Sequence, residues 1–171
     1  MIGIYIHIIR FFLFVLAQGL IVGQLDFGFG IHPMIYPLFI LLLPFDMSAI
    51  ALMIIAFVTG VSVDFFMNTF GLHASAAVIM AYFRPELFKL FSPRDGYESF
   101  RQPSVVDLGY KWFISVSSLM VLIHHVWFFF LEYFRLSDVL YILQKTFLSG
   151  VLTLLIFVLI QIIFFKKQRM S

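Results

Sequence analysis

Long stretches without charged residues constrain this chain more than any other feature of its sequence. A run of about 18 or more such residues is long enough to cross the hydrocarbon core of a bilayer as a helix. The runs without Asp, Glu, Lys or Arg that reach this length are Phe27–Phe45, Phe65–Phe83, Trp112–Leu131 and Thr146–Phe165. Met47–Val63 nearly reaches it, and Arg10 alone interrupts a further apolar run near the N-terminus. The sequence therefore predicts an integral membrane protein.

These runs predict an all-α fold, a bundle of six transmembrane helices in a single integral membrane domain over residues 1–171. A helix needs about 20 residues to cross a hydrocarbon core of about 30 Å. We place the spans at 4–22, 33–45, 47–66, 71–91, 112–132 and 142–165. Only 12% of the residues are charged, about half the usual fraction, so no separate soluble domain is expected.

The 33–45 span differs from the others because it contains Pro33, Pro37 and Pro44. Proline removes a backbone donor and limits the length of a helix. We therefore expect this span to be a short, kinked or tilted helix.

The basic residues predict the orientation, because cationic loops stay in the cytoplasm. The connection at 92–111, the tail at 166–171 and their flanks hold eight of the eleven basic residues. With an even number of spans, this connection and both termini face the cytoplasm. The connection is either a solvated linker or a docking surface for a cytosolic partner or for anionic lipid headgroups.

Polar residues near the end of the third span are the main candidates for a functional site. A polar group inside a membrane costs several kcal/mol unless it is paired. The candidates are Gly60, Asp64, Asn68, Gly71 and His73. In one interpretation they only end one helix and start the next. In the other, a buried Asp64 carboxylate fixes the hairpin of the third and fourth spans or binds a partner.

Two adjacent histidines lie in the fifth span, at His124 and His125. Neighbours on a helix point about 100° apart, so one helix cannot direct both at one metal ion. We expect them to pack and to form hydrogen bonds between helices. The chain has no cysteine, and it lacks the phosphate-loop, zinc-peptidase and serine-hydrolase motifs. No metal, cofactor, nucleic acid or enzymatic activity is predicted.

Small residues four apart predict close contacts between helices in lipid. The pairs are Gly19 and Gly23, Ala56 and Gly60, and Ala77 and Ala81. Such pairs are frequent in apolar sequences, so this pattern is a weak signal.

The central segment, residues 57–82, reads F-V-T-G-V-S-V-D-F-F-M-N-T-F-G-L-H-A-S-A-A-V-I-M-A-Y. It resembles the rod shape-determining protein family MreD, in which a glycine, an aspartate four residues later, and a glycine followed by leucine recur. Here these are Gly60, Asp64, Gly71 and Leu72, while Ala74 and Tyr82 also agree. The segment that follows, Tyr82-Phe-Arg-Pro85, is similar to the version found in Bacteroidetes.

The resemblance implies a non-enzymatic protein of the bacterial inner membrane. Members of this family belong to the elongation machinery that directs peptidoglycan synthesis and cell shape. The direct partner would be the single-pass protein MreC, and contact with MreB, RodA and a penicillin-binding transpeptidase would be indirect. The family fold also resembles the substrate-binding S components of energy-coupling-factor transporters.

Two hypotheses follow from the resemblance. In the first, the third and fourth spans present a small-residue face to the transmembrane helix of MreC, and Asp64 and Asn68 touch its periplasmic part. In the second, the protein is a transporter subunit that binds a small vitamin-like molecule. S components commonly carry two alanines four residues apart in the first span, where this chain has only Ala17.

Overall fold

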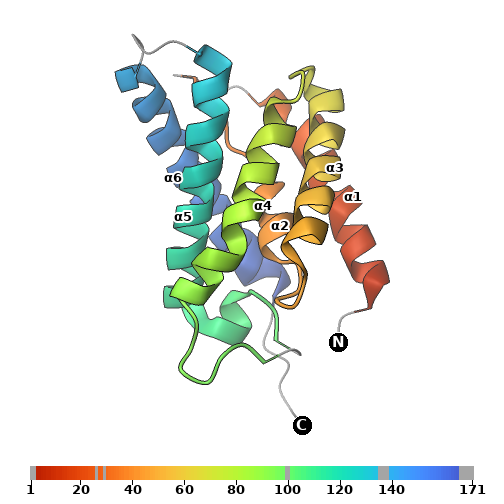
Figure 1. Cartoon of the computed structure of the whole chain (residues 1–171). Helices are drawn as coiled ribbons and strands as arrows, with labels where there is room; N and C mark the ends of the chain where they lie inside the picture. The colour runs from red at the N-terminus through yellow and green to blue at the C-terminus, as the bar shows by residue number, and fades with distance from the viewer. Residues whose placement is uncertain (1–2, 26, 29, 99–100, 135–138, 166–171) are drawn as a thin grey trace.

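The computed structural model describes residues 3–25, 27–28, 30–98, 101–134 and 139–165, and this part of the chain is helical with irregular connections. The helices are α1 (Ile4–Leu20), the 3-10 turn η1 (Val22–Gln24), α2 (Pro37–Leu41), α3 (Ala49–Met67), α4 (Leu72–Leu90), α5 (Val105–Tyr133) and α6 (Val139–Phe164). Figure 1 shows α1, α3 and α5 running in one direction and α4 and α6 in the other. The start of α1, the end of α6 and the connection between α4 and α5 therefore lie at one end of the bundle, which we call the terminal end.

Four helical segments are long and apolar enough to cross a membrane. They are Ile4–Gln24, Ala49–Met67, Val105–Tyr133 and Val139–Phe164. Helix α4 has the same length as α3, 19 residues, but its last two turns carry Arg84, Glu86 and Lys89. Many large apolar side chains of the long helices are exposed, as expected for surfaces solvated by lipid. The structure is therefore that of an all-α membrane protein.

The predicted helix at 33–45 is corrected by the structure. Only Pro37–Leu41 is helical, and five residues rise about 7.5 Å, a quarter of a hydrocarbon core. Pro37 occupies the first turn of α2, a position where its missing N–H costs nothing. The expectation of a short helix is thus confirmed, although the chain before Pro37 is not helical at all. Residues 33–43 are nonetheless all buried.

Side chains of α1 and α6 bind the non-helical backbone before α2. The amides of His32 and Met34 donate to Ser149 Oγ and Thr153 Oγ1, each at 3.0 Å. The amide of Ile35 donates to Gln18 Oε1 at 2.6 Å. Backbone groups without partners cost several kcal/mol in a membrane interior. These buried side chains therefore allow an unwound segment to lie inside the bundle.

The other end of α2 is bound by a residue of α4. Arg84 is 1% exposed, and its guanidinium donates to the carbonyls of Leu41, Leu43 and Pro44. Carbonyls at the end of a helix lack intrahelical donors and carry partial negative charge. Arg84 therefore takes the place of the next helical turn that Pro44 prevents.

The remaining boundaries agree with the predicted spans except at the start of α5. That helix begins at Val105 rather than at 112, and it is interrupted at Gly109, where φ is 81° and ψ is 163°. Ser104 starts it, because its side chain accepts a hydrogen bond from the amide of Asp107. The predicted connection at 92–111 therefore ends in a helical turn. The predicted tail at 166–171 lies outside the described residues.

The unwound segment provides a matched test of stability. Thr153→Val leaves the buried Met34 amide without an acceptor and also removes the contact with His125 Nε2, and we expect a loss of about 1–3 kcal/mol in the free energy of unfolding. Thr59→Val is the control, because Thr59 is equally buried and bonds only the carbonyl of Ile55 in its own helix. Thermal unfolding in detergent measures both, and equal losses would contradict this role for Thr153.

Candidate functional site

All five residues of the predicted site lie at or near the turn between α3 and α4, and Asp64 is the centre of its hydrogen bonds. One carboxylate oxygen accepts from the amide of His73 at 3.0 Å and from Thr69 Oγ1 at 2.5 Å. The other oxygen accepts from the amide of Ala74 at 2.9 Å. The first amides of a helix have no intrahelical acceptor, and an anion is favoured beside them. Asp64 of α3 therefore caps the start of α4.

Asn68 and Gly71 reverse the chain between the two helices. Both have left-handed backbone conformations, with φ of 56° and 93° respectively. Asn68 ends α3, and Gly71 precedes the first residue of α4. Asparagine and glycine tolerate this conformation better than other residues. The helix-termination and hairpin-fixing interpretations of these residues therefore describe one and the same turn.

Gly60 sets the distance between α3 and α4. A Cβ atom added to Gly60 would lie 2.6 Å from the amide nitrogen of Ala74 and 2.7 Å from the carbonyl oxygen of His73. Both are backbone atoms, so the two helices could not keep their present separation with a larger residue. Gly60 and Asp64, one turn apart on α3, thus both contact the first turn of α4.

The small-residue pairs are used within the protein. Ala56, Gly60, Ala77 and Ala81 are all buried. On α1, an added Cβ at Gly19 would lie 2.5 Å from Phe66 Cβ, and one at Gly23 would lie 2.7 Å from Met67 Cε. Phe66 and Met67 belong to the end of α3. The prediction of close helix contacts is confirmed for these pairs, but the hypothesis that α3 and α4 present a small-residue face to a partner is wrong.

His73 belongs to a buried cluster with Tyr36 and His124. The Tyr36 hydroxyl lies 2.5 Å from His124 Nε2 and 3.3 Å from His73 Nδ1, and it also bonds the His73 carbonyl at 3.1 Å. The neighbouring His125 contacts Thr153 Oγ1 at 3.2 Å instead. The two adjacent histidines therefore bond different segments, His124 the chain before α2 and His125 helix α6, as their angular separation on α5 requires. The described residues contain no group of three or more His, Asp or Glu side chains that could hold a metal ion.

Sequence reasoning missed Gln18, Tyr36, Ser149 and Thr153. Ser149 and Thr153 are four residues apart and so lie on one face of a helix, a spacing that marks a polar stripe in an otherwise apolar span. That signal predicts a buried polar face on α6. It does not indicate that the partner is the backbone of residues 32–34.

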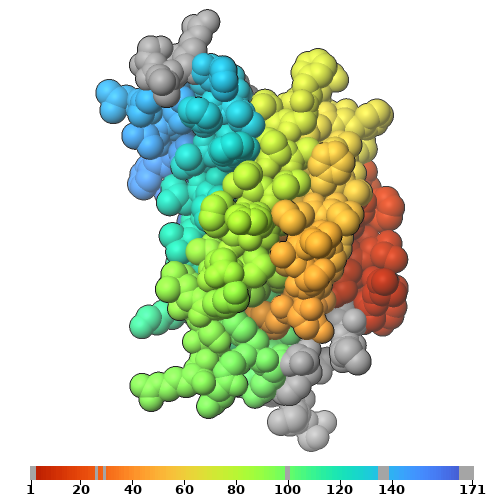
Figure 2. All heavy atoms as spheres, viewed as in Figure 1, coloured from red at the N-terminus to blue at the C-terminus, as the bar shows by residue number. Residues whose placement is uncertain are grey.

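The surface also carries an apolar groove between α1 and α3. Figure 2 shows these two helices and α4 next to one another on one side of the molecule. The groove has a volume of about 330 Å³, with walls that include Ile8 of α1 and Ile54 and Val58 of α3. Phe39 and Leu43 of the α2 region also line it. His7 is the one polar side chain in its lining.

Comparisons with known proteins give no match. No protein-family model, no curated protein and no solved structure matches this chain.

Gly60 offers a direct test of the close helix contact. We expect Gly60→Ala to destabilise the protein by about 1–3 kcal/mol, because the new methyl group meets backbone atoms of α4. Gly150→Ala is the matched control, since Gly150 is also buried in a helix and its added Cβ would meet only Val121 Cγ1, at 3.6 Å. That control should be neutral or slightly stabilising in thermal unfolding. The reverse order of the two variants would contradict the contact.

The cap on α4 gives a second test. Asp64→Ala leaves the amides of His73 and Ala74 without their acceptor, and a lost cap costs about 0.5–2 kcal/mol. Asp64→Asn keeps one oxygen acceptor, so its loss should be smaller. Melting temperatures in detergent check that Asp64→Ala is more destabilising than Asp64→Asn. Unchanged melting temperatures in both variants would indicate that Asp64 acts only by binding another protein.

Proposed function

We propose that this protein is a non-enzymatic scaffold of the cell-elongation machinery in the inner membrane, similar to MreD, with both termini in the cytoplasm. In this role it binds the transmembrane helix of a single-pass partner similar to MreC, and through it MreB, RodA and a penicillin-binding transpeptidase. The resemblance at residues 57–82 supports the family. The apolar groove between α1 and α3 is the observation that carries the binding role.

The groove exists because α2 is short. A full transmembrane helix at 33–45 would fill the space between α1 and α3, whereas the five residues of α2 leave part of it open. Its walls are apolar and exposed, with Ile8 51% and Ile54 58% accessible. In lipid, a concave surface between two helices allows a further transmembrane helix to pack closely against both of them.

The buried polar side chains support a structural rather than a catalytic role. The backbone of residues 34–41 is bonded by Gln18, Thr153 and Arg84. The backbone of α4 is bonded by Asp64. Side chains committed to the fold in this way are not available as acids, bases or nucleophiles. The interior is therefore best explained as a framework that keeps the outer faces of α1 and α3 in place.

A vitamin-binding transporter subunit is the alternative, and one observation favours it. His73 Nε2 and His124 Nδ1 are buried without hydrogen-bond partners in the described part of the chain. A small polar ligand that reached this cluster would satisfy both nitrogens. A rise in melting temperature with one vitamin of a panel, lost in His124→Phe, would support this alternative against the scaffold.

Site-directed cross-linking tests the scaffold, because the native chain has no cysteine. Ile8→Cys and Ile54→Cys place a thiol on each wall of the groove, and we expect both to form disulfides with cysteines along the transmembrane helix of MreC in native membranes. Leu155→Cys is the control, since Leu155 on α6 is equally exposed, at 57%, but lies outside the groove. Equal cross-linking at all three positions, or at Leu155 alone, would contradict docking in the groove.

A further inference from the structure

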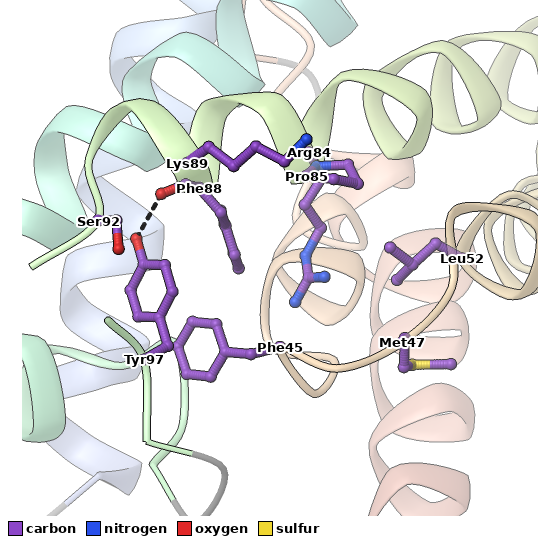
Figure 3. Close-up of a pocket in the computed structure, with 9 residues that line it drawn as sticks. All are labelled: Phe45, Met47, Leu52, Arg84, Pro85, Phe88, Lys89, Ser92 and Tyr97. Carbon is purple, nitrogen blue, oxygen red and sulfur yellow. Dashed lines mark hydrogen bonds between the residues drawn. The ribbon is translucent and has the colours of Figure 1, made fainter. Parts of the chain in front are cut away.

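A second cavity, of about 300 Å³, lies where α4 ends and the chain turns toward α5. Figure 3 shows the side chains around it. They include Phe45 before α3, Arg84, Phe88 and Lys89 on α4, and Ser92 and Tyr97 in the connection that follows. The cavity is at the terminal end of the bundle, away from the turn that holds Asp64 (Figure 1).

Arg84 brings a buried positive charge to this cavity. Its guanidinium is held by three backbone carbonyls and stacks over the Phe88 ring, with Cζ 4.2 Å from the ring centroid. Carbonyls and aromatic rings carry no net charge, so these contacts hold the guanidinium without neutralising it. Within the described residues, Arg84 forms no ion pair with a carboxylate, and its Nε has no hydrogen-bond partner. A buried charge is costly without an opposite charge beside it.

No group that lines the cavity supplies a negative charge to balance Arg84. The lining residues include no Asp or Glu. Burial raises the pKa of Tyr97, so its phenol is neutral at physiological pH. Lys89 adds a second cation at the mouth, although it also pairs with Glu86 at 2.7 Å on the exposed surface. The electrostatic balance of the cavity is therefore positive.

The aromatic residues around the cavity are typical of the membrane interface. Tyr97 stacks on Phe45, with centroids 4.3 Å apart, and accepts a hydrogen bond from Trp112 Nε1 at 2.9 Å. Tyrosine and tryptophan gather at the level of the lipid headgroups, because one end of each side chain is apolar and the other is polar. The cavity thus lies at the depth where phosphate groups of lipids are found.

We propose that this cavity binds a phosphate group, with Arg84 as its opposite charge. Guanidinium groups match phosphate oxygens in geometry, and charge-assisted hydrogen bonds of this kind are among the strongest in proteins. The volume is at the lower end of the range for small-ligand sites, which fits a headgroup rather than a larger ligand. The phosphate belongs either to an anionic lipid headgroup or to a soluble phosphate, and this site is independent of the groove proposed for MreC.

Native mass spectrometry of the full chain in mixed micelles tests the proposal. The probes are phosphatidylglycerol and phosphatidylcholine with identical acyl chains. Both carry a phosphate group, but the trimethylammonium group of phosphatidylcholine balances its charge, whereas phosphatidylglycerol keeps a net negative charge. We expect about a tenfold preference for phosphatidylglycerol, as one charge-assisted hydrogen bond supplies. Displacement of that lipid by millimolar inorganic phosphate would assign the cavity to soluble phosphate, and its retention would assign it to the headgroup. Equal binding of the two lipids, with no binding of inorganic phosphate, would overturn the proposal.

Three variants test whether the preference for phosphatidylglycerol arises in this cavity. Ser92→Trp fills the mouth while leaving the contacts of Arg84 in place, and it should abolish the preference. Arg84→Gln should do the same, and where loss of its contacts with the α2 region prevents folding, Ser92→Trp decides alone. Lys111→Gln is the control, because it removes an exposed positive charge at the terminal end of the bundle but outside the cavity. A preference that survives Ser92→Trp, or that disappears in Lys111→Gln, would also overturn the proposal.

Discussion

Hydrogen bonding of the non-helical backbone on both sides of α2 is the constraint on which the rest of this structure depends. A membrane interior offers no water, so each amide and carbonyl of a non-helical segment needs a protein partner. The partners come from three different helices: Gln18 of α1, Thr153 of α6 and Arg84 of α4. Because these side chains bond the segment at 32–44 near both of its ends, they fix where this segment lies between the long helices. The groove between α1 and α3 and the cavity beside Arg84 both result from this arrangement.

The same constraint explains why so apolar a chain buries polar side chains. Several of them, Gln18, Ser149, Thr153 and Arg84, bond backbone groups that a continuous helix would have bonded itself. Asp64 accepts hydrogen bonds from the first turn of α4, across a turn in which Asn68, Phe70 and Gly71 all have positive φ. The functional surfaces we propose are therefore not the polar interior itself. They are the two places where the shortened second helix leaves space, one apolar and one positively charged.

Much of this could be predicted from the sequence, because its signals are local. Runs without charge predicted the long helices, the three prolines predicted a short, kinked or tilted second helix, and Asp64, Asn68 and Gly71 predicted the end of one helix and the start of the next. Contacts between distant segments could not be predicted. Nothing near Thr153 indicates that it bonds Met34, and nothing near Arg84 indicates that it caps α2. The earlier start of α5 depends on Gly109, whose positive φ permits a break that hydropathy does not detect.

The segment around α2 is far in sequence from some of the side chains that bond it, and this has a consequence for biogenesis. The amide of Met34 is bonded by a residue 119 positions later in the chain, so it emerges from the ribosome long before that partner is made. The hydrogen bond to the Met34 amide can form only after α6 has been made, so the fold closes only when synthesis is nearly finished.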